Sequence, residues 1–329
     1  NSFKNFTHSS QNKNSLPDNT IHSIFVDTNS KIWIATNCGL SLFDPFRETF
    51  RNFKDVSGIH YTIQRAIYNV YSTSDDRIWV GTVSDLCYFD SKDTDLILSG
   101  KKNVNHMFIQ DIYWGISNPT VYCVFEDSFK NVWIGSNGGG ASFISSTSSF
   151  FHSWRINKIP GVTNGLNDKE VLTICVADNG NIWMGTDGGG INVNIDGRNC
   201  MFYSHDTGDI SSNTYHSSLK DSNGDLWFGN MYNEMGIDVF ISKEGRFIHY
   251  TPQGNGSVIY CLFEDNQRNV WIGSNNGLEI YNLITKKKDF LNKENSQLLT
   301  NEIKAVSQDK NGNIWIGTLN KGISIYNPE

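Results

Sequence analysis

Seven copies of one tryptophan-containing segment predict an all-β fold, a seven-bladed β-propeller of four-stranded antiparallel blades. The segment has the form of residues 313–318, Asn-Ile-Trp-Ile-Gly-Thr, and its tryptophan recurs at positions 33, 79, 133, 183, 227, 271 and 315. Consecutive tryptophans are 46, 54, 50, 44, 44 and 44 residues apart. A period near 44 residues is typical of four-stranded propeller blades and is longer than the common helical repeats of ~34 residues.

Each unit contains four short apolar runs that we expect to be strands. An alternating run such as residues 259–265 comes first, and a polar turn such as 309–313 follows, in which Asn and Gly tolerate positive φ angles. The tryptophan strand is second. A strand that begins with Gly, as at 277–281, is third, and a short aromatic strand, as at 247–250, is fourth. The period of two favours strands throughout, and no helical pattern competes with them.

The two ends of the chain carry parts of one unit. The seventh unit stops after its third strand, at residues 324–326, whereas residues 3–6, Phe-Lys-Asn-Phe, match the fourth-strand pattern. We therefore expect the N-terminal residues to complete the last blade and close the ring, which removes unpaired strand edges. Residues 1–329 are expected to form a single propeller. Because the chain does not begin with Met, we also expect it to be a fragment of a larger protein.

Composition and motifs exclude several classes of protein. The net charge of −7 argues against nucleic-acid binding, which needs a basic surface. No apolar run approaches the ~20 residues of a membrane span. The six cysteines form no CxxC pair. The glycine runs at 138–140 and 188–190 lack the Gly-Lys-Ser/Thr ending of a phosphate loop, so we interpret them as turns. We predict no metal and no cofactor.

The complete repeat pattern, I-x-x-I-x-x-D-x-x-G-x-[IVL]-W-[IV]-G-[ST]-x-x-G-[LI]-x-x-[YF], resembles the two-component regulator propeller repeat over essentially the whole chain. Departures are local: Thr73 and Ala177 replace the turn Asp, and Ala35 and Asn230 interrupt the Gly-Thr pair. The resemblance implies the periplasmic sensor region of a hybrid two-component histidine kinase of the inner membrane. Such proteins typically carry two tandem propellers, a β-sandwich, a membrane span, a kinase and a regulator, and many control polysaccharide use.

One column of the repeat is polar or aromatic where a core column would be aliphatic. Eleven residues before each tryptophan, at the expected channel end of the first strand, lie His22, Tyr68, Tyr122, Leu172, His216, Tyr260 and Lys304. The column just before it is aliphatic in most units, as Ile21 and Ile303 illustrate. The polar column predicts a solvated channel mouth. The alternative is that these rings pack between blades with their polar tips hydrogen-bonded.

Loop length varies on the same side of the repeat. Segments 91–120 and 155–170 are longer than their counterparts, and unit five has an extended turn at 231–235. Because long loops on a rigid scaffold commonly carry binding residues, we expect a ligand over the channel mouth beside units two to five. Trp114, which has no counterpart in other units, is the main candidate for stacking. The predicted ligand-binding residues are Arg65, Tyr68, Tyr113, Trp114, Arg155, His216, Tyr232 and Glu234.

These features favour a sensor domain that binds an oligosaccharide or another small ligand. Its other expected partners are further domains of the parent sensor, a second propeller and a β-sandwich, and a second copy of itself in a homodimer. The first alternative is a protein-interaction or dimerisation scaffold. The second is a propeller polysaccharide lyase or glycosidase, because Glu170, Glu234 and Glu302 could reach the channel mouth. We predict no catalytic residues, since no nucleophile elbow or zinc-protease motif is present.

Overall fold

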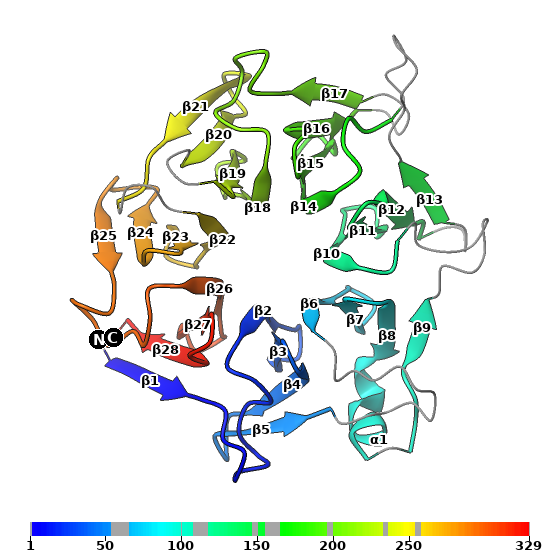
Figure 1. Ribbon diagram of the computed structural model, residues 1–329, viewed down its shortest axis with the longest axis vertical. Coiled ribbons are helices and arrows are strands. Elements are labelled where there is room, and N and C mark those ends of the chain that lie inside the picture. The colour runs from blue at the N-terminus through cyan, green and yellow to red at the C-terminus, as the bar shows by residue number, and fades with distance from the viewer. Residues whose placement is uncertain are drawn as a thin grey trace.

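The computed structural model describes residues 2–53, 66–99, 101–107, 118–146, 151–154, 165–195, 200–232, 236–253 and 258–328. These residues form seven four-stranded antiparallel sheets that lie radially around a common centre (Figure 1). The sheets follow one another around the ring in chain order, each with its first strand nearest the centre. The predicted seven-bladed propeller is therefore confirmed.

The first four blades follow the repeat units of the sequence. The first blade is β2 (Ile21–Val26), β3 (Ile32–Thr36), β4 (Gly39–Asp44) and β5 (Thr49–Asn52). The second is β6 (Ile67–Ser72), β7 (Arg77–Thr82), β8 (Leu86–Asp90) and β9 (Asn105–Met107). The third is β10 (Val121–Glu126), β11 (Val132–Ser136), β12 (Gly140–Ile144) and β13 (Phe151–Trp154). The fourth is β14 (Val171–Val176), β15 (Ile182–Thr186), β16 (Ile191–Asn194) and β17 (Cys200–Tyr203).

The last three blades complete the ring. The fifth is β18 (Tyr215–Lys220), β19 (Leu226–Asn230), β20 (Ile237–Ile241) and β21 (Arg246–Tyr250). The sixth is β22 (Ile259–Glu264), β23 (Asn269–Ser274), β24 (Leu278–Asn282) and β25 (Lys288–Leu291). The seventh is β26 (Ile303–Gln308), β27 (Ile314–Thr318) and β28 (Ile323–Asn327), with β1 (Ser2–Phe6) as its outer strand. The register pairs Phe3 with Tyr326 and Phe6 with Ile323, as the closure prediction requires.

One element differs from the sequence prediction, which expected no helix. Between β8 and β9 lie a short 3-10 segment, η1 (Ser91–Asp93), and one helical turn, α1 (Thr94–Leu98). They belong to the insertion of the second unit. Ile97 of α1 is 1% exposed and packs with Phe89 and Val104 against the first two blades. Leu98 of the same turn is partly buried against this cluster. These two side chains anchor a helical turn that is too short to give a helical pattern in the sequence.

The hydrophobic core lies between adjacent blades. All seven repeat tryptophans are at most 4% exposed, and each packs among apolar side chains of the following blade. The repeat glycine of the tryptophan strand makes this approach possible. A Cβ atom on Gly317 would lie 2.5 Å from Cγ2 of Ile21 in the next blade, so a side chain there would push the blades apart. Six units carry this glycine, and the first has the small residue Ala35 in its place, which is 0% exposed. The seven interfaces are therefore closely similar.

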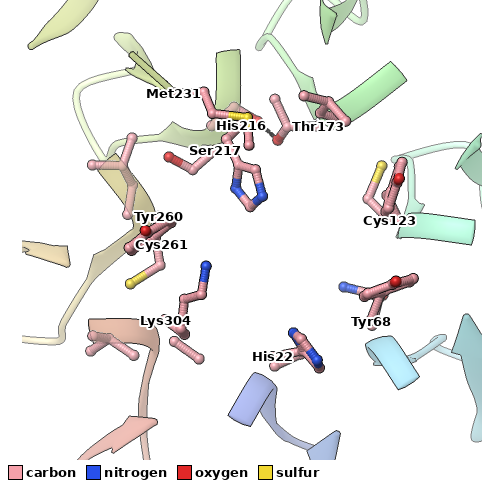
Figure 2. Close-up of a pocket in the computed structure, with 18 of the residues that line it drawn as sticks. His22, Tyr68, Cys123, Thr173, His216, Ser217, Met231, Tyr260, Cys261 and Lys304 are labelled. Atoms are coloured by element: carbon pink, nitrogen blue, oxygen red, sulfur yellow. Dashed lines mark hydrogen bonds between the residues drawn. The ribbon is translucent and has the colours of Figure 1, made fainter. Parts of the chain in front are cut away.

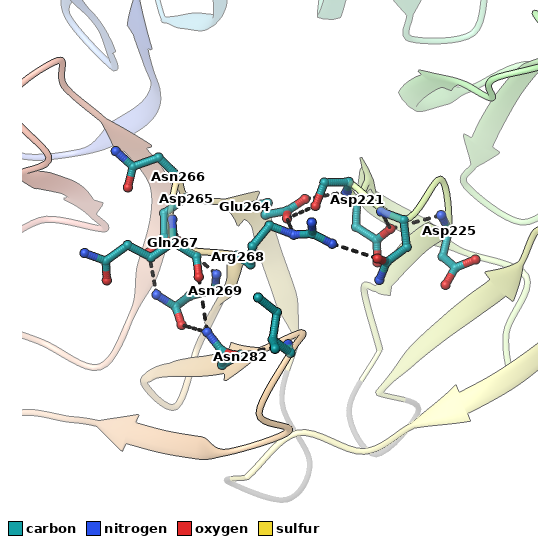
Figure 3. Close-up of polar contacts among 12 residues, drawn as sticks. Asp221, Asp225, Glu264, Asp265, Asn266, Gln267, Arg268, Asn269 and Asn282 are labelled. Carbon is teal, nitrogen blue, oxygen red and sulfur yellow. Dashed lines mark hydrogen bonds and ion pairs between the residues drawn. The ribbon is translucent and has the colours of Figure 1, made fainter.

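The turn aspartate anchors the tryptophan of its own blade. In unit six, Oδ1 of Asp265 accepts hydrogen bonds from the backbone N–H groups of Gln267 and Asn269 (Figure 3). Its Oδ2 accepts one from the Trp271 indole at 2.8 Å. The same bond to the indole occurs at Asp27, Asp127, Asp221 and Asp309. Both carboxylate oxygens thus accept N–H donors, which explains why this turn recurs with an aspartate.

Unit four lacks this anchor. Ala177 occupies the aspartate position, and the indole nitrogen of Trp183 is buried with no hydrogen-bond partner among the residues that the structure describes. The backbone of the turn is nevertheless that of the other units. The Ala177 N–H donates to the Asn181 carbonyl at 3.0 Å, and the Gly180 N–H donates to the Ala177 carbonyl at 2.9 Å. Only the side-chain acceptor is missing.

We expect Ala177→Asp to raise the free energy of unfolding by about 1 kcal/mol, because it gives a buried indole N–H its acceptor without changing the turn. Urea denaturation of the variant and the parent measures this difference. The reciprocal change Asp265→Ala, which makes unit six resemble unit four, should destabilise the protein by at least as much. A lower stability of Ala177→Asp would contradict the role assigned to the turn aspartate.

Candidate functional site

Seven β-bulges form a ring at the centre of the propeller. In the first blade, Ile21 pairs with Thr36 and Ser23 pairs with Ala35, so that His22 between them has no partner in β3. The same register shift leaves one residue unpaired in every other inner strand: Tyr68, Tyr122, Leu172, His216, Tyr260 and Lys304. A bulge turns its extra residue out of the regular alternation of the strand. The bulged residues are the polar column of the sequence.

These seven side chains line a cavity of about 500 Å³ (Figure 2). This volume lies within the ~300–1,000 Å³ of typical small-molecule sites. The acidic residues Glu170 and Asp187 and the apolar Met231 also line the cavity. The column immediately before the bulges, from Ile21 to Ile303, is 0% exposed. Each inner strand therefore sends one residue into the core and the next into the cavity.

Aromatic side chains follow one another around much of the ring. The centroids of the His22 and Tyr68 rings are 5.2 Å apart, and those of Tyr68 and Tyr122 are 5.3 Å apart. On the other side, the His216 and Tyr260 centroids are 6.2 Å apart. The Nζ atom of Lys304 lies 3.4 Å from the centroid of the Tyr260 ring, a cation–π contact. Rings held by their neighbours offer a preformed stacking surface.

The basic groups of the cavity are affected by burial. Burial, together with the nearby positive charge of Lys304, lowers the pKa of His216 to about 4. Burial also lowers the pKa of His22, against a hydrogen bond with Asn37 that raises it. Burial lowers the pKa of Lys304. At neutral pH the two imidazoles are therefore neutral.

Acidic groups lie on the side of the fourth blade. Glu170 directly precedes β14, and Asp187 directly follows β15. An oxygen of Glu170 is 3.5 Å from the Lys169 ammonium, and Oδ1 of Asp187 accepts a hydrogen bond from the Thr214 hydroxyl at 3.3 Å. Within the described ranges, no three His, Cys, Asp or Glu side chains gather closely enough to hold a metal ion.

Two cysteines also line the cavity. Burial raises the pKa values of the Cys123 and Cys261 thiols to about 12. Because the thiolate is the reactive form, these side chains behave as small apolar groups at neutral pH.

Three of the eight predicted ligand-binding residues lie within the described residues. Tyr68 and His216 line the cavity. Tyr232 is 58% exposed and directly follows Met231, which lines the cavity. The other five predicted residues lie outside the described residues: Arg65, Tyr113, Trp114, Arg155 and Glu234.

Other lining residues were recognised in the sequence but not selected. The preference for units two to five left out His22, Tyr260 and Lys304, although the polar column contained them. The register shift occurs at the same position of all seven inner strands. Membership of the polar column was therefore a better predictor of the lining residues than loop length. Among the carboxylates considered for catalysis, Glu170 lines the cavity, whereas Glu302 is not one of its lining residues.

Five segments of the chain match the family described as two component regulator propeller: residues 15–38, 115–138, 165–188, 253–276 and 297–320. Five of its seven units therefore match the two component regulator propeller repeat. Each matched segment contains the bulged residue, the position of the turn aspartate and the tryptophan of one unit, as Tyr260, Asp265 and Trp271 do in the fourth segment. The features that define the regulator propeller repeat are thus the ones that build the ring and its interfaces.

Solved structures share the fold of this regulator propeller. The extracellular domain of a putative hybrid two component system from B. thetaiotaomicron is 20% identical, with a TM-score of 0.74 over 99% of this chain and 40% of its own. Virginiamycin B lyase from Staphylococcus aureus is 11% identical, with a TM-score of 0.70 over 98% of this chain and 97% of its own. At these identities the likeness establishes the fold alone.

A histidine kinase is similar in sequence to part of the regulator propeller. Histidine kinase P4 of Formosa agariphila is 23% identical over 134 residues, which make up 38% of this chain and 8% of that protein. The chain therefore spans a small part of this relative and about two fifths of the B. thetaiotaomicron domain. The described part of the chain contains no helix of the length and apolarity needed to cross a membrane.

Proposed function

We propose that this regulator propeller is the ligand-sensing module of a hybrid two-component histidine kinase and that it binds an oligosaccharide in the cavity at its centre. The observation that carries the proposal is the ring of seven bulges. Each bulge leaves one residue of the inner strand without a partner in the neighbouring strand. The seven side chains of these unpaired residues all line the same cavity. A propeller that only had to be stable would gain nothing from polar bulges at this position.

The chemistry of the lining suits a saccharide. The rings of Tyr68, Tyr122 and Tyr260 offer faces and edges on which the C–H groups of a sugar can pack. Carboxylates accept hydrogen bonds, so Glu170 and Asp187 suit sugar hydroxyls as donors. A concave site with a few fixed polar groups and aromatic walls is the usual form of a small-molecule pocket.

The five matched repeats support the sensor part of the proposal. In this account, residues 1–329 are one propeller of a longer protein, located in the periplasm, and the binding event passes to further domains of that protein. The B. thetaiotaomicron domain of similar fold is described as extracellular, and the Formosa relative is described as a histidine kinase. Both descriptions fit a propeller that meets its ligand outside the cytoplasm.

Isothermal titration calorimetry against neutral and acidic oligosaccharides tests the function, with chromatography of the sugar afterwards. We expect heat of binding and an unchanged sugar. Tyr68→Ala and Tyr260→Ala should each weaken binding by at least about 1 kcal/mol, as ring anchors in a pocket do. Phe129→Ala is the matched control, because Phe129 is 70% exposed and lies in a turn at the far end of β10 from the cavity.

Each other outcome favours a different function. Cleavage of the sugar would support a propeller lyase or glycosidase. Absence of heat with every sugar would support an interaction or dimerisation scaffold. Binding that is weakened by Phe129→Ala and not by the two tyrosine variants would place the ligand on the opposite face.

A further inference from the structure

A lysine side chain in the cavity has no anionic partner among the described residues. The Lys304 ammonium extends from the bulge of β26 into the cavity, where it contacts the face of the Tyr260 ring. No carboxylate oxygen of the described residues lies within 4.0 Å of the Lys304 Nζ atom, the distance limit for an ion pair. Burial lowers the pKa of this ammonium, although the charge of Glu302, two residues earlier in the chain, raises it. The positive charge is therefore only partly compensated. A lysine that served packing alone would extend its charged end into water.

Two histidine nitrogens beside it are also without partners. Nε2 of His22 and Nδ1 of His216 are buried and have no hydrogen-bond partner within the described part of the chain. Figure 2 shows that Lys304 and His216 point toward the same open space from β26 and β18, with His22 at its edge on β2. Burial is the main cause that lowers the pKa values of both imidazoles, and the positive charge of Lys304 lowers both as well, against Asp187 at His216 and Asp18 at His22.

The two carboxylates that line the cavity come from a blade that contributes nothing to this arc. Glu170 and Asp187 belong to the fourth blade, whereas Lys304, His22 and His216 belong to the seventh, first and fifth. Asp187 lies near His216, whose pKa its charge raises, whereas Lys304 stands across the ring from the fourth blade (Figure 1). The cavity is therefore polarised along the line from the fourth blade to the seventh. A ligand with one anionic end would be oriented by attraction to Lys304 and by repulsion from the two carboxylates.

We propose that the arc formed by Lys304, His22 and His216 is a subsite for one anionic group of the saccharide, a carboxylate or a sulfate. The inference rests on the proposed function and names the class of sugar that the cavity accepts. Lys304 supplies the charge, and the imidazoles supply N–H donors that the protein leaves unused. The hydroxyls of the same sugar then face Glu170 and Asp187.

Calorimetry with three matched probes tests this subsite: a galacturonic acid trisaccharide, a sulfated galactose trisaccharide and the neutral galactose trisaccharide. Wild type should bind one of the acidic probes at least tenfold more tightly than the neutral probe, and the probe it prefers identifies the anion. Lys304→Met should remove that preference and change binding of the neutral probe by less than threefold. Lys321→Met is the control, because Lys321 is exposed in the turn between β27 and β28 of the same blade.

A second measurement does not depend on the folding of a variant. NMR titration of wild type should show that the pKa of His216 rises from about 4 when inorganic sulfate or the preferred acidic probe is present, because a bound anion stabilises the imidazolium. Other titratable groups also face this cavity: His22, Lys304, Glu170, Asp187 and the tyrosines Tyr68, Tyr122 and Tyr260. The titration is therefore read from the His216 ring itself.

The outcomes separate the two proposals. If neutral and acidic probes bind equally well and Lys304→Met has no effect, the anionic subsite is wrong and the saccharide proposal stands. If sulfate raises the His216 pKa but no saccharide binds, the subsite stands and the saccharide proposal is wrong. If no probe gives heat and no anion changes the His216 titration, both are overturned.

Discussion

Removal of residues 2–7 should lower the free energy of unfolding by several kcal/mol, on the order of 5, because it strips the seventh blade of its outer strand. Five residues of β1 pair with β28. The Phe3 ring lies 5.0 Å from that of Tyr326, and the Phe6 ring lies 5.5 Å from that of Phe43 in the first blade. The truncated chain loses these contacts and exposes an unpaired strand edge.

Thermal and urea denaturation measure the effect of this truncation. The double variant Ser2→Ala, Lys4→Ala is the control, because both side chains are exposed and the strand remains in place. It should melt close to the parent. A truncated chain that melted within about a degree of the intact one would show that closure through β1 contributes nothing to stability.

Trp271→Ala should cost about 3–5 kcal/mol, because the space between the sixth and seventh blades cannot collapse around a ring of that size. Trp271 is 2% exposed and packs with Leu298, Ile303 and Ile316. The substitution also takes one donor from the buried Asp265 carboxylate. Urea denaturation gives the difference. Phe46→Ala, at a side chain that is 97% exposed, should be nearly neutral, and equal losses in the two variants would refute the interface role of the tryptophan.

The sequence was sufficient to predict the fold because every blade repeats the same pattern of strands, turn and tryptophan. The tryptophan period gave the number of blades, and the Phe-Lys-Asn-Phe start gave the closing strand. The helical turn α1 was missed because it spans only five residues, of which Ile97 and Leu98 pack against the core. The consequence of Ala177 was also missed, since a side chain must be placed in space before its effect on the Trp183 indole is visible.

The candidate site was predictable in part. The polar column identified the residues that face the cavity, because a period of 44 residues brings equivalent positions together in a ring. The sequence could not tell which members act together. His22, His216 and Lys304 are far apart along the chain, and they meet only because the ring closes. The bulges that turn them inward change the apolar spacing of the inner strands from two to three, as between Ile21 and Ile24, and this spacing was not interpreted as a bulge.

Binding to a Leu172→Trp variant tests the central claim, that the bulge ring holds the ligand. Leu172 is the bulged residue of the fourth blade, and an indole there would fill much of the cavity. Asn311→Trp places the same ring on the opposite face, in the exposed turn after β26. Calorimetry with the best-binding trisaccharide should show that Leu172→Trp abolishes binding and Asn311→Trp does not. Unchanged affinity in a correctly folded Leu172→Trp variant would contradict the account.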